Sequence, residues 1–183
     1  MDKMRRWIVL GILIFACFAS GVPEYLFPGE QSAVTTLFLV RHAEKAQDGS
    51  ADPPLTPAGT ARAEELAYML GHIELDAIYS TPYVRTRQTV LLTAENKDLE
   101  VKLYAPGEKD FLKKILETYS GGIVLIAGHS NTIPALANEL AGGPLFDDLD
   151  ESVYDNLFIA IVPIDGKPLI HRMRFGARTP EQD

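Results

Sequence analysis

TLFLVRHAEK, residues 36–45, is the stretch that decides the fold. Its apolar residues 37–40 predict a strand buried in a sheet that is covered on both faces, because such strands read as continuous apolar runs. The run ends abruptly at Arg41 and His42. Ligands of open α/β sheets bind just beyond the carboxyl ends of the strands, so we expect this pair at a binding site. A guanidinium fits a phosphate group, and a neutral imidazole nitrogen can attack phosphorus.

Strands and helices alternate along the rest of the chain. Short apolar runs predict strands at 76–79, 101–104, 123–127, 157–164 and 169–174, and helical patterns fall at 58–70, 83–95, 109–119 and 133–141. Thr56 is placed to cap the first helix, with Pro57 at its first position. This alternation predicts an α/β fold: a three-layer α/β/α sandwich on a mostly parallel sheet, with an antiparallel edge hairpin formed by the last two strands.

Composition limits the classes of function. A chain of 183 residues is the length of one domain with a substantial core. Its formal net charge is -8, and residues 1–21 contribute +2, so the remainder carries -10. That acidity argues against a nucleic-acid-binding protein, although a local cluster of arginines still allows a phosphate site. The sequence does not indicate an oligomeric state.

Residues 1–21 are interpreted as a signal peptide or an N-terminal membrane anchor. Three basic residues precede an uncharged, mostly apolar stretch at 7–20, which is short for a membrane span of about 20 residues. Small residues at 19–21 suit cleavage, whereas Cys17 partly matches a bacterial lipoprotein box. Cleaved export, lipoprotein attachment and an uncleaved anchor therefore remain open, and each predicts an exported protein of the periplasm or cell envelope.

The domain boundaries follow from turn-forming and polar stretches. We expect a linker at 22–34, one domain at 35–176 and a flexible tail at 177–183. Cys17 is the one cysteine of the chain, which excludes an intramolecular disulfide and a cysteine-based metal site. The four histidines show no short metal-ligand spacing, so no metal or other cofactor is expected.

Three predicted strands end in residues that suit a phosphate group. The first ends at Arg41 and His42, the second is followed by Arg85 one turn into the next helix, and a third ends at His129. Parallel strands bring these ends to one edge, where helix N-termini add backbone donors. In this pocket Arg41, Arg85 and His129 would hold the phosphoryl oxygens, and His42 would attack phosphorus.

Four motifs, taken together and in this order, resemble the histidine phosphatase superfamily, also called phosphoglycerate-mutase-like. They are LVRHAE at 39–44, LTPAG at 55–59, YSTP at 79–82 followed by RTRQT at 85–89, and GHSN at 128–131. Ala43 stands where the family commonly has Gly, and we expect no loss of activity from it. The short chain resembles compact SixA-like and Ais-like bacterial members, the former acting on phosphohistidine in proteins and the latter associated with phosphate on lipopolysaccharide core sugar.

The resemblance implies a metal-independent phosphomonoester hydrolase that works through a phosphohistidine at His42. Its substrate would be a small-molecule or glycan-linked phosphomonoester. Arg41, Arg85 and His129 would form the rest of the phosphate pocket. Ser130 and Asn131 are further candidate phosphate donors, although turn and helix-cap roles are equally open to them.

The acid that protonates the leaving group is left open by the sequence. In mutase-like members it is a Glu after the Arg-Thr-x-x-Thr helix, which makes Glu108 the best-placed residue. Asp110 is the next candidate, and Glu151 in the acidic loop 144–154 is a more remote one. All three can also be solvated surface carboxylates.

Two other functions remain open. One is a phosphoglycerate-mutase-type phosphotransferase, which the short chain and the N-terminal segment make less suitable. The other is a non-catalytic envelope module that only binds phosphate groups. The complete set of pocket cations argues against the loss of catalysis.

Overall fold

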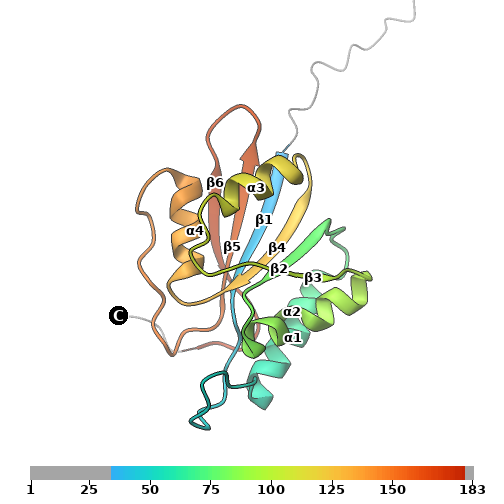
Figure 1. Ribbon diagram of the computed structural model, residues 1–183, viewed down its shortest axis with the longest axis vertical. Helices are drawn as coiled ribbons and strands as arrows, with labels where there is room; N and C mark the ends of the chain where they lie inside the picture. The colour runs from blue at the N-terminus through green and yellow to red at the C-terminus, as the bar shows by residue number, and fades with distance from the viewer. Residues whose placement is uncertain (1–33, 180–183) are drawn as a thin grey trace, which may run out of the picture. The chain divides into compact units, whose positions relative to one another are not determined.

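A computed structural model describes residues 34–179. These residues form one six-stranded sheet and four helices (Figure 1). In chain order the elements are β1 (Val34–Arg41), α1 (Pro57–Met69), β2 (Ala77–Ser80), α2 (Val84–Lys97), β3 (Val101–Leu103), α3 (Phe111–Thr118), β4 (Ile123–Gly128), α4 (Thr132–Ala141), β5 (Asn156–Pro163) and β6 (Leu169–Arg174). The interpretations of residues 1–21, of Cys17 and of most of the linker fall outside the described residues.

The sheet is mixed in the way the sequence predicts. Its strand order is β3-β2-β4-β1-β5-β6. The first four strands of that order run parallel, whereas β5 is antiparallel to β1 and β6 is antiparallel to β5. The prediction of an α/β fold with a mostly parallel sheet and an antiparallel edge hairpin is therefore confirmed.

The buried strand β1 separates two apolar cores. Successive side chains of a strand point to opposite faces of the sheet. Leu37 and Leu39 accordingly join the core under α3 and α4, whereas Phe38 and Val40 join the core under α1 and α2. Because both faces are covered, β1 is apolar from Leu37 to Val40, and its polar residues stand toward its two ends, at Thr35, Thr36 and Arg41.

The first helix begins as predicted. Thr56 caps α1, its Oγ1 accepting a hydrogen bond from the backbone N of Gly59 (3.1 Å) and donating one to the carbonyl of Glu44 (3.2 Å). The helix approaches the backbone of Glu44 so closely that a Cβ at Gly59 would clash with this carbonyl. The LTPAG stretch therefore fixes the loop that follows Arg41 and His42.

Some boundaries differ from the sequence prediction. Helix α3 starts two residues later than expected, because Asp110 takes a left-handed conformation with φ of 60°. Helix α2 continues to Lys97, where Asp98 (φ 52°) forms the left-handed cap. Within the expected tail, Ala177 and Thr179 are hydrogen-bonded to Arg62 and Asp155.

Two searches of the described residues give negative results. Between residues 34 and 179, none of the helices combines the length and hydropathy that a membrane span requires. In the same range, no group of three or more His, Cys, Asp or Glu side chains is arranged to hold a metal ion.

Candidate active site

Three adjacent strands bring the predicted site residues to one edge of the sheet. β4 lies between β1 and β2, with Arg41 opposite Gly128 and Ser80 opposite Ala127. The residues that follow these pairs leave the sheet at the same level. The predicted convergence of the strand ends is thereby observed in the part of the chain that the structure describes.

His42 presents one free nitrogen. The ring is buried, and its Nδ1 lies 2.8 Å from the carbonyl of Ala43. A carbonyl oxygen only accepts, so Nδ1 carries the hydrogen and Nε2 keeps its lone pair. Burial, together with the charges of Arg41 and Arg85, lowers the pKa of His42 to about 3. The imidazole is therefore uncharged at any physiological pH, and its free nitrogen is available to attack an electrophile.

His129 faces His42 from the neighbouring strand. The two ring centroids lie 5.5 Å apart in an edge-on arrangement. Nε2 of His129 lies 3.0 Å from Oγ1 of Thr81, which follows β2. Burial, Arg85 and Arg41 lower the pKa of His129 to about 4. This edge thus holds two neutral imidazoles.

Arg41 is fully buried, and the acidic loop surrounds its guanidinium. Nη1 donates to the carbonyls of Asp150 (2.6 Å) and Val153 (2.7 Å). Nη2 lies 3.3 Å from the carboxylate of Glu151, and the guanidinium carbon lies 4.3 Å from the centre of the Tyr154 ring. Burial lowers the pKa of Arg41, although nearby acidic groups oppose this. Arg41 therefore holds the loop against the site.

Arg85 approaches the site from the first turn of α2. Its guanidinium lies 4.5 Å from the centre of the Tyr83 ring and 3.5 Å from a carboxylate oxygen of Asp52. The Tyr83 ring also makes an edge-on contact with His129, at 5.1 Å between centroids. Arg87, two positions further along the same helix, is exposed.

Unpartnered donors mark this edge as a binding site. Among the described residues, three buried side-chain polar atoms have no hydrogen-bond partner, and two of them are Nε of Arg41 and Nε of Arg85. A buried donor without a partner costs about 1–3 kcal/mol, and more when it belongs to a charged group. Both donors come from the predicted phosphate-binding arginines, so an anion bound there would remove this cost.

The carboxylate candidates lie in different surroundings. Glu151 accepts from Ser130 Oγ (2.9 Å) and pairs with Arg41, and it is one of the charges that act on His129. Glu108 pairs with Lys114 (2.8 Å) and accepts from the backbone of Ala105, and this hydrogen bonding lowers its pKa.

The remaining candidates are polar residues at helix starts. Asp110 precedes α3 in the left-handed conformation. Asn131 occupies the N-cap position of α4 without a side-chain capping bond. The hydroxyl of Ser130 donates to the carboxylate of Glu151, and the carbonyl of Ser130 accepts from the backbone N of Leu149. Of the three carboxylates, Glu151 is therefore the one joined to the cluster of arginines and histidines.

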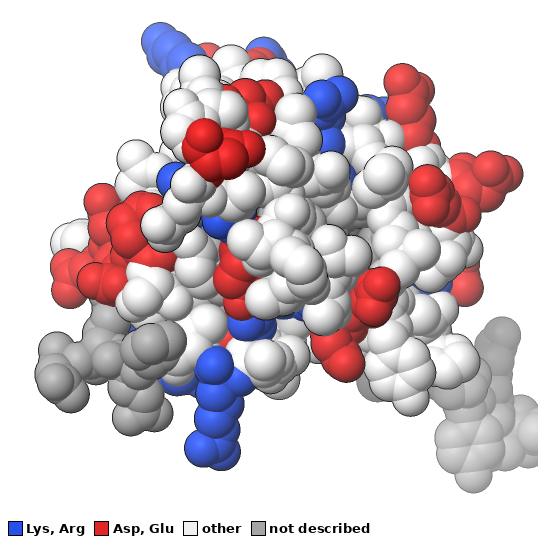
Figure 2. Space-filling model, turned by 90° about the horizontal axis from the view of Figure 1, so that it is seen from below, with Lys and Arg blue, Asp and Glu red and all other residues white. Residues whose placement is uncertain are grey.

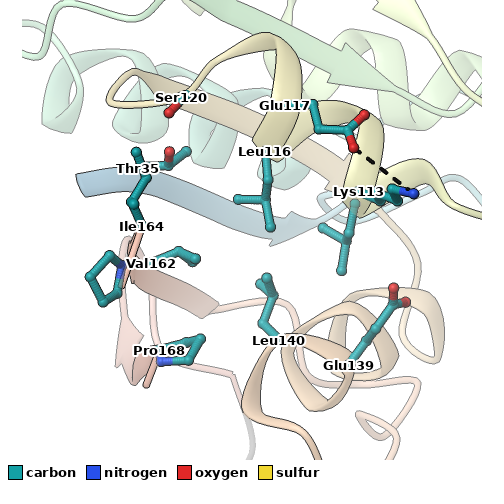
Figure 3. A pocket seen from close by; sticks show the side chains of 12 residues that line it. Thr35, Lys113, Leu116, Glu117, Ser120, Glu139, Leu140, Val162, Ile164 and Pro168 are labelled. Carbon is teal, nitrogen blue, oxygen red and sulfur yellow. Dashed lines mark ion pairs between the residues drawn. The ribbon is translucent and has the colours of Figure 1, made fainter. Parts of the chain in front are cut away.

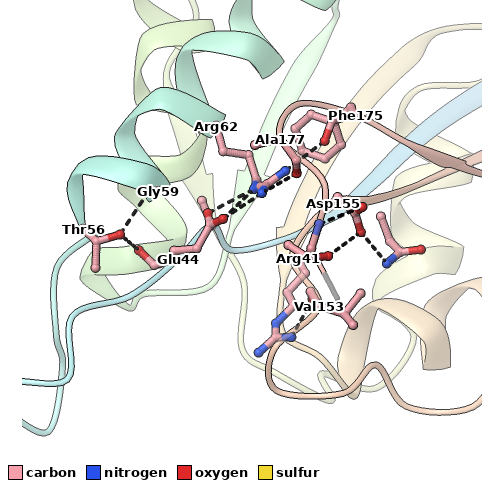
Figure 4. Close-up of polar contacts among 12 residues, drawn as sticks. Arg41, Glu44, Thr56, Gly59, Arg62, Val153, Asp155, Phe175 and Ala177 are labelled. Carbon is pink, nitrogen blue, oxygen red and sulfur yellow. Dashed lines mark hydrogen bonds and ion pairs between the residues drawn. The ribbon is translucent and has the colours of Figure 1, made fainter. Parts of the chain in front are cut away.

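A second buried arginine supports the loop after His42 (Figure 4). Arg62 on α1 binds both carboxylate oxygens of Glu44 through Nε (3.2 and 3.0 Å), and Nη2 approaches one of them to 2.7 Å. Its Nη1 and Nη2 also donate to the carbonyls of Phe175 and Ala177. Burial opposes ionisation of Glu44, but Arg62 lowers its pKa overall. The C-terminal segment is thereby tied to the catalytic edge.

The sequence does not single out several residues of this edge. Thr81 sits inside the YSTP motif and Tyr83 directly follows it, but ring contacts and a buried hydroxyl contact leave no pattern in one sequence. Asp52 and Arg62 come from the loop and helix after β1, and only the folded chain shows their partners.

The surface at this edge carries mixed charge. Figure 2 views the molecule from below relative to Figure 1, the side on which β1 ends, and shows Lys and Arg side chains interspersed with Asp and Glu. The surface around the site therefore carries charges of both signs.

An apolar groove lies elsewhere, between α3, α4 and the β5–β6 hairpin (Figure 3). Its volume is about 460 Å³, and Leu116, Leu140 and Val162 line it together with the ion-paired Lys113 and Glu117. None of the residues that line it belongs to the cluster of arginines and histidines.

The match to a known family falls on the part of the chain that carries Arg41, His42 and Arg85. Residues 37–105 match the family model of the histidine phosphatase superfamily (branch 1). A 71-residue stretch is 45% identical to phosphoserine phosphatase 1 of Hydrogenobacter thermophilus. That match covers 36% of this chain and 34% of the relative, so it spans about a third of the relative's length.

Solved structures extend the likeness to most of the chain. The protein histidine phosphatase SixA complexed with tungstate has a TM-score of 0.62 and 18% identity, over 76% of this chain and 96% of that one. A phosphoserine phosphatase mutant from Entamoeba histolytica in complex with phosphoserine has a TM-score of 0.57 and 17% identity, over 77% and 96%. At these identities the two structures establish a shared fold.

Proposed function

We propose that this chain, whose residues 37–105 match the family model of the histidine phosphatase superfamily, hydrolyses phosphomonoesters through a phosphohistidine at His42, without a metal ion. The observation that carries the proposal is the pair of buried, unpartnered Nε atoms on Arg41 and Arg85 beside a neutral His42. Donors without acceptors call for an anion, and the free Nε2 of His42 can attack it.

In the first half of the reaction the phosphoryl group leaves its alcohol. Nε2 of His42 forms a bond to phosphorus as the bond from phosphorus to the ester oxygen breaks. Arg41, Arg85 and His129 bind the phosphoryl oxygens, whose charge changes in the transition state. The departing alkoxide takes a proton from a carboxylic acid. In the second half, water attacks phosphorus, the bond to Nε2 breaks, and the carboxylate takes the proton from water.

Glu151 is our choice for that acid. It is 3.3 Å from Arg41 and hydrogen-bonded to Ser130, at the mouth of the site. A phosphate bound between the arginines would bring the leaving-group oxygen of the substrate close to this carboxyl group, which could then act as the general acid. Glu108, the first choice from the sequence, is engaged with Lys114.

The acid is tested with a matched pair of substitutions. Glu151→Gln is expected to lower kcat for alkyl phosphates about 10²-fold, and to lower it less for aryl phosphates, whose leaving groups need no proton. Glu108→Gln is the control and should leave kcat within about twofold of the parent. The reverse pattern would assign the acid to Glu108.

Substrate choice is proposed from the charges at the mouth of the site. Asp52 and Glu151 each lie beside a phosphate-binding arginine, at 3.5 and 3.3 Å. They would favour an ammonium group on the substrate. Phosphoserine is therefore the first substrate to measure, in keeping with the name of the 45% identical relative. Its kcat/KM is to be compared with that of 3-phosphoglycerate, which has a hydroxyl group where phosphoserine has the ammonium group. A higher kcat/KM for 3-phosphoglycerate, or mutase turnover, would favour the phosphotransferase alternative.

We also propose that the protein works in the cell envelope, on the strength of the basic and apolar pattern of residues 1–21. Fractionation of cells that express the full chain, with mass spectrometry of its N-terminus, separates a cleaved signal, a lipid on Cys17 and an uncleaved anchor. Recovery of the intact chain in the cytoplasmic fraction would contradict export.

The central experiment measures hydrolysis of a generic aryl phosphate in EDTA. The full chain is expected to be active, and His42→Ala to lose at least about 10³-fold in kcat/KM, because no other group can form the covalent intermediate. The parent should also yield an acid-labile phosphoenzyme on rapid quenching, which His42→Ala should not. Full activity in His42→Ala would exclude this mechanism. Saturable phosphate binding without any hydrolysis would favour the binding-module alternative.

A further inference from the structure

We infer that Thr81, with Thr86 behind it, is a positioning residue that fixes the tautomer of His129 and directs the exchangeable proton of His129 to the phosphoryl group. The effect of Thr81 on catalysis rests on the proposed function. Its effect on the tautomer of His129 concerns the protein without substrate.

The two hydroxyls lie in a buried row. Thr81 and Thr86 are both completely buried, and Thr81 Oγ1 donates to Thr86 Oγ1 at 2.9 Å. Thr81 Oγ1 also lies 3.0 Å from Nε2 of His129. These residues come from the end of β2, from the first turns of α2 and from the end of β4, so three elements hold the row in place.

The direction of the first hydrogen bond decides the second. A hydroxyl has one hydrogen to donate, and Thr81 uses it on Thr86. Toward His129 it can then only accept, so Nε2 of His129 must carry a hydrogen. The nitrogen that gains or loses a proton is therefore Nδ1, which has no hydrogen-bond partner among the residues from 34 to 179.

The charges around His129 disfavour a proton on its ring until a phosphate dianion binds between the arginines. Arg85, Arg41 and Lys45 face the ring and disfavour its cationic form, whereas Glu151 favours it, and the other neighbours are His42 and the Tyr83 ring. A phosphate dianion between the arginines would offset their charge. Nδ1 would then hold a proton and donate it to a phosphoryl oxygen, while Nε2 continues to donate to Thr81.

The alternative is that the two threonines only fill the core at this strand end. Thr93 provides the matched control, because it too is a buried threonine of α2, and its hydroxyl has no hydrogen-bond partner. Replacing it with valine removes a hydroxyl at the same burial without touching His129.

The experiment reads the ring nitrogens directly. The full chain is labelled with ¹⁵N-histidine, and the signals of its four histidines are assigned with His129→Gln. The parent is expected to hold His129 as the Nε2–H tautomer at pH 7, and inorganic phosphate should protonate Nδ1. Thr81→Ser should keep this tautomer, and Thr81→Val should yield a mixture. Thr86→Val frees the hydrogen of Thr81 for Nε2 and should reverse the tautomer to Nδ1–H.

Kinetics supply the second readout. Thr81→Val is expected to lower kcat/KM about 10- to 100-fold and to change its pH profile, with rescue by Thr81→Ser and no change in Thr93→Val. A parent-like tautomer in both Thr81→Val and Thr86→Val would overturn the inference, as would phosphate that binds without protonating Nδ1. An inactive parent with the expected tautomer and phosphate response would refute the proposed hydrolysis and leave the positioning role standing.

Discussion

Two buried arginines show how a structural site differs from a binding site in this molecule. Arg62 is 3% exposed and Arg41 is 0% exposed. Arg62 has a partly buried carboxylate partner in Glu44, and its Nε and both Nη atoms are all hydrogen-bonded. Arg41 has backbone carbonyls and the exposed carboxylate of Glu151 as acceptors, and its Nε has none.

The difference lies in what each guanidinium still lacks. Arg62 has a full set of acceptors and a paired counter-charge, so its environment is complete without a ligand. Arg41 has been desolvated without a buried anion to replace water, and its neighbour Arg85 has the same deficit at Nε. A buried cation that lacks an acceptor indicates a bound anion, whereas burial alone does not.

The largest effect is expected from a substitution of Arg41, the arginine that lacks an acceptor at Nε. Arg41→Met should lower kcat/KM by about 10³-fold, or about 4 kcal/mol of transition-state stabilisation, because a donor to the phosphoryl group is lost. Its free energy of unfolding should change by less than about 1 kcal/mol, since the released loop carbonyls can be hydrated. Steady-state kinetics and urea unfolding measure the two quantities. Strong destabilisation with normal turnover would make Arg41 a structural residue like Arg62.

The next largest effect is expected at Arg62, where a substitution should lower stability much more than activity. Arg62→Met leaves the carboxylate of Glu44 without its partner and should lower the free energy of unfolding by about 3 kcal/mol. The folded fraction should keep kcat within a few-fold, because Arg62 contacts no reacting group. Adding Glu44→Gln should recover part of the loss, which a double-mutant cycle quantifies. A loss of activity as large as that of Arg41→Met, without loss of stability, would contradict the assignment.

The same comparison shows what the sequence alone can predict. The fold followed from the run at 37–40 and the alternation after it, because buried parallel strands leave a direct pattern of apolar residues. His42, Arg41, Arg85 and His129 were recognisable since each follows a strand end within an ordered motif.

Contacts between distant segments left no such pattern. Arg62 and Glu44 are 18 positions apart, and nothing in their spacing marks them as a pair. The closure of the acidic loop over Arg41 depends on carbonyl groups, which every residue has. The choice of Glu108 followed a family position, whereas the structure joins Glu151 to the site through Ser130 and Arg41.

The smallest expected effect is on the pH dependence of stability, which should differ between the two histidines of the site and the Arg62–Glu44 pair. His42 and His129 have pKa values of about 3 and 4 in the folded protein, against 6.5 in the unfolded chain. Below pH 6.5 the unfolded chain binds protons that the folded protein does not, so stability falls as the pH falls toward 4. Glu44 behaves differently, because Arg62 lowers its folded pKa below 4.5, and its contribution persists until the pH falls below that value.

Unfolding measured at pH 7 and pH 5 tests this separation. The parent should lose about 1–2 kcal/mol more between these pH values than His42→Asn, which lacks one of the two groups. The double variant Arg62→Met/Glu44→Gln should show the same loss as the parent over this range, since it lacks the Glu44 carboxylate and the intact pair does not titrate there. An unchanged pH dependence in His42→Asn would mean that the folded site accepts a proton near pH 6, and the nucleophile would then be partly protonated at neutral pH.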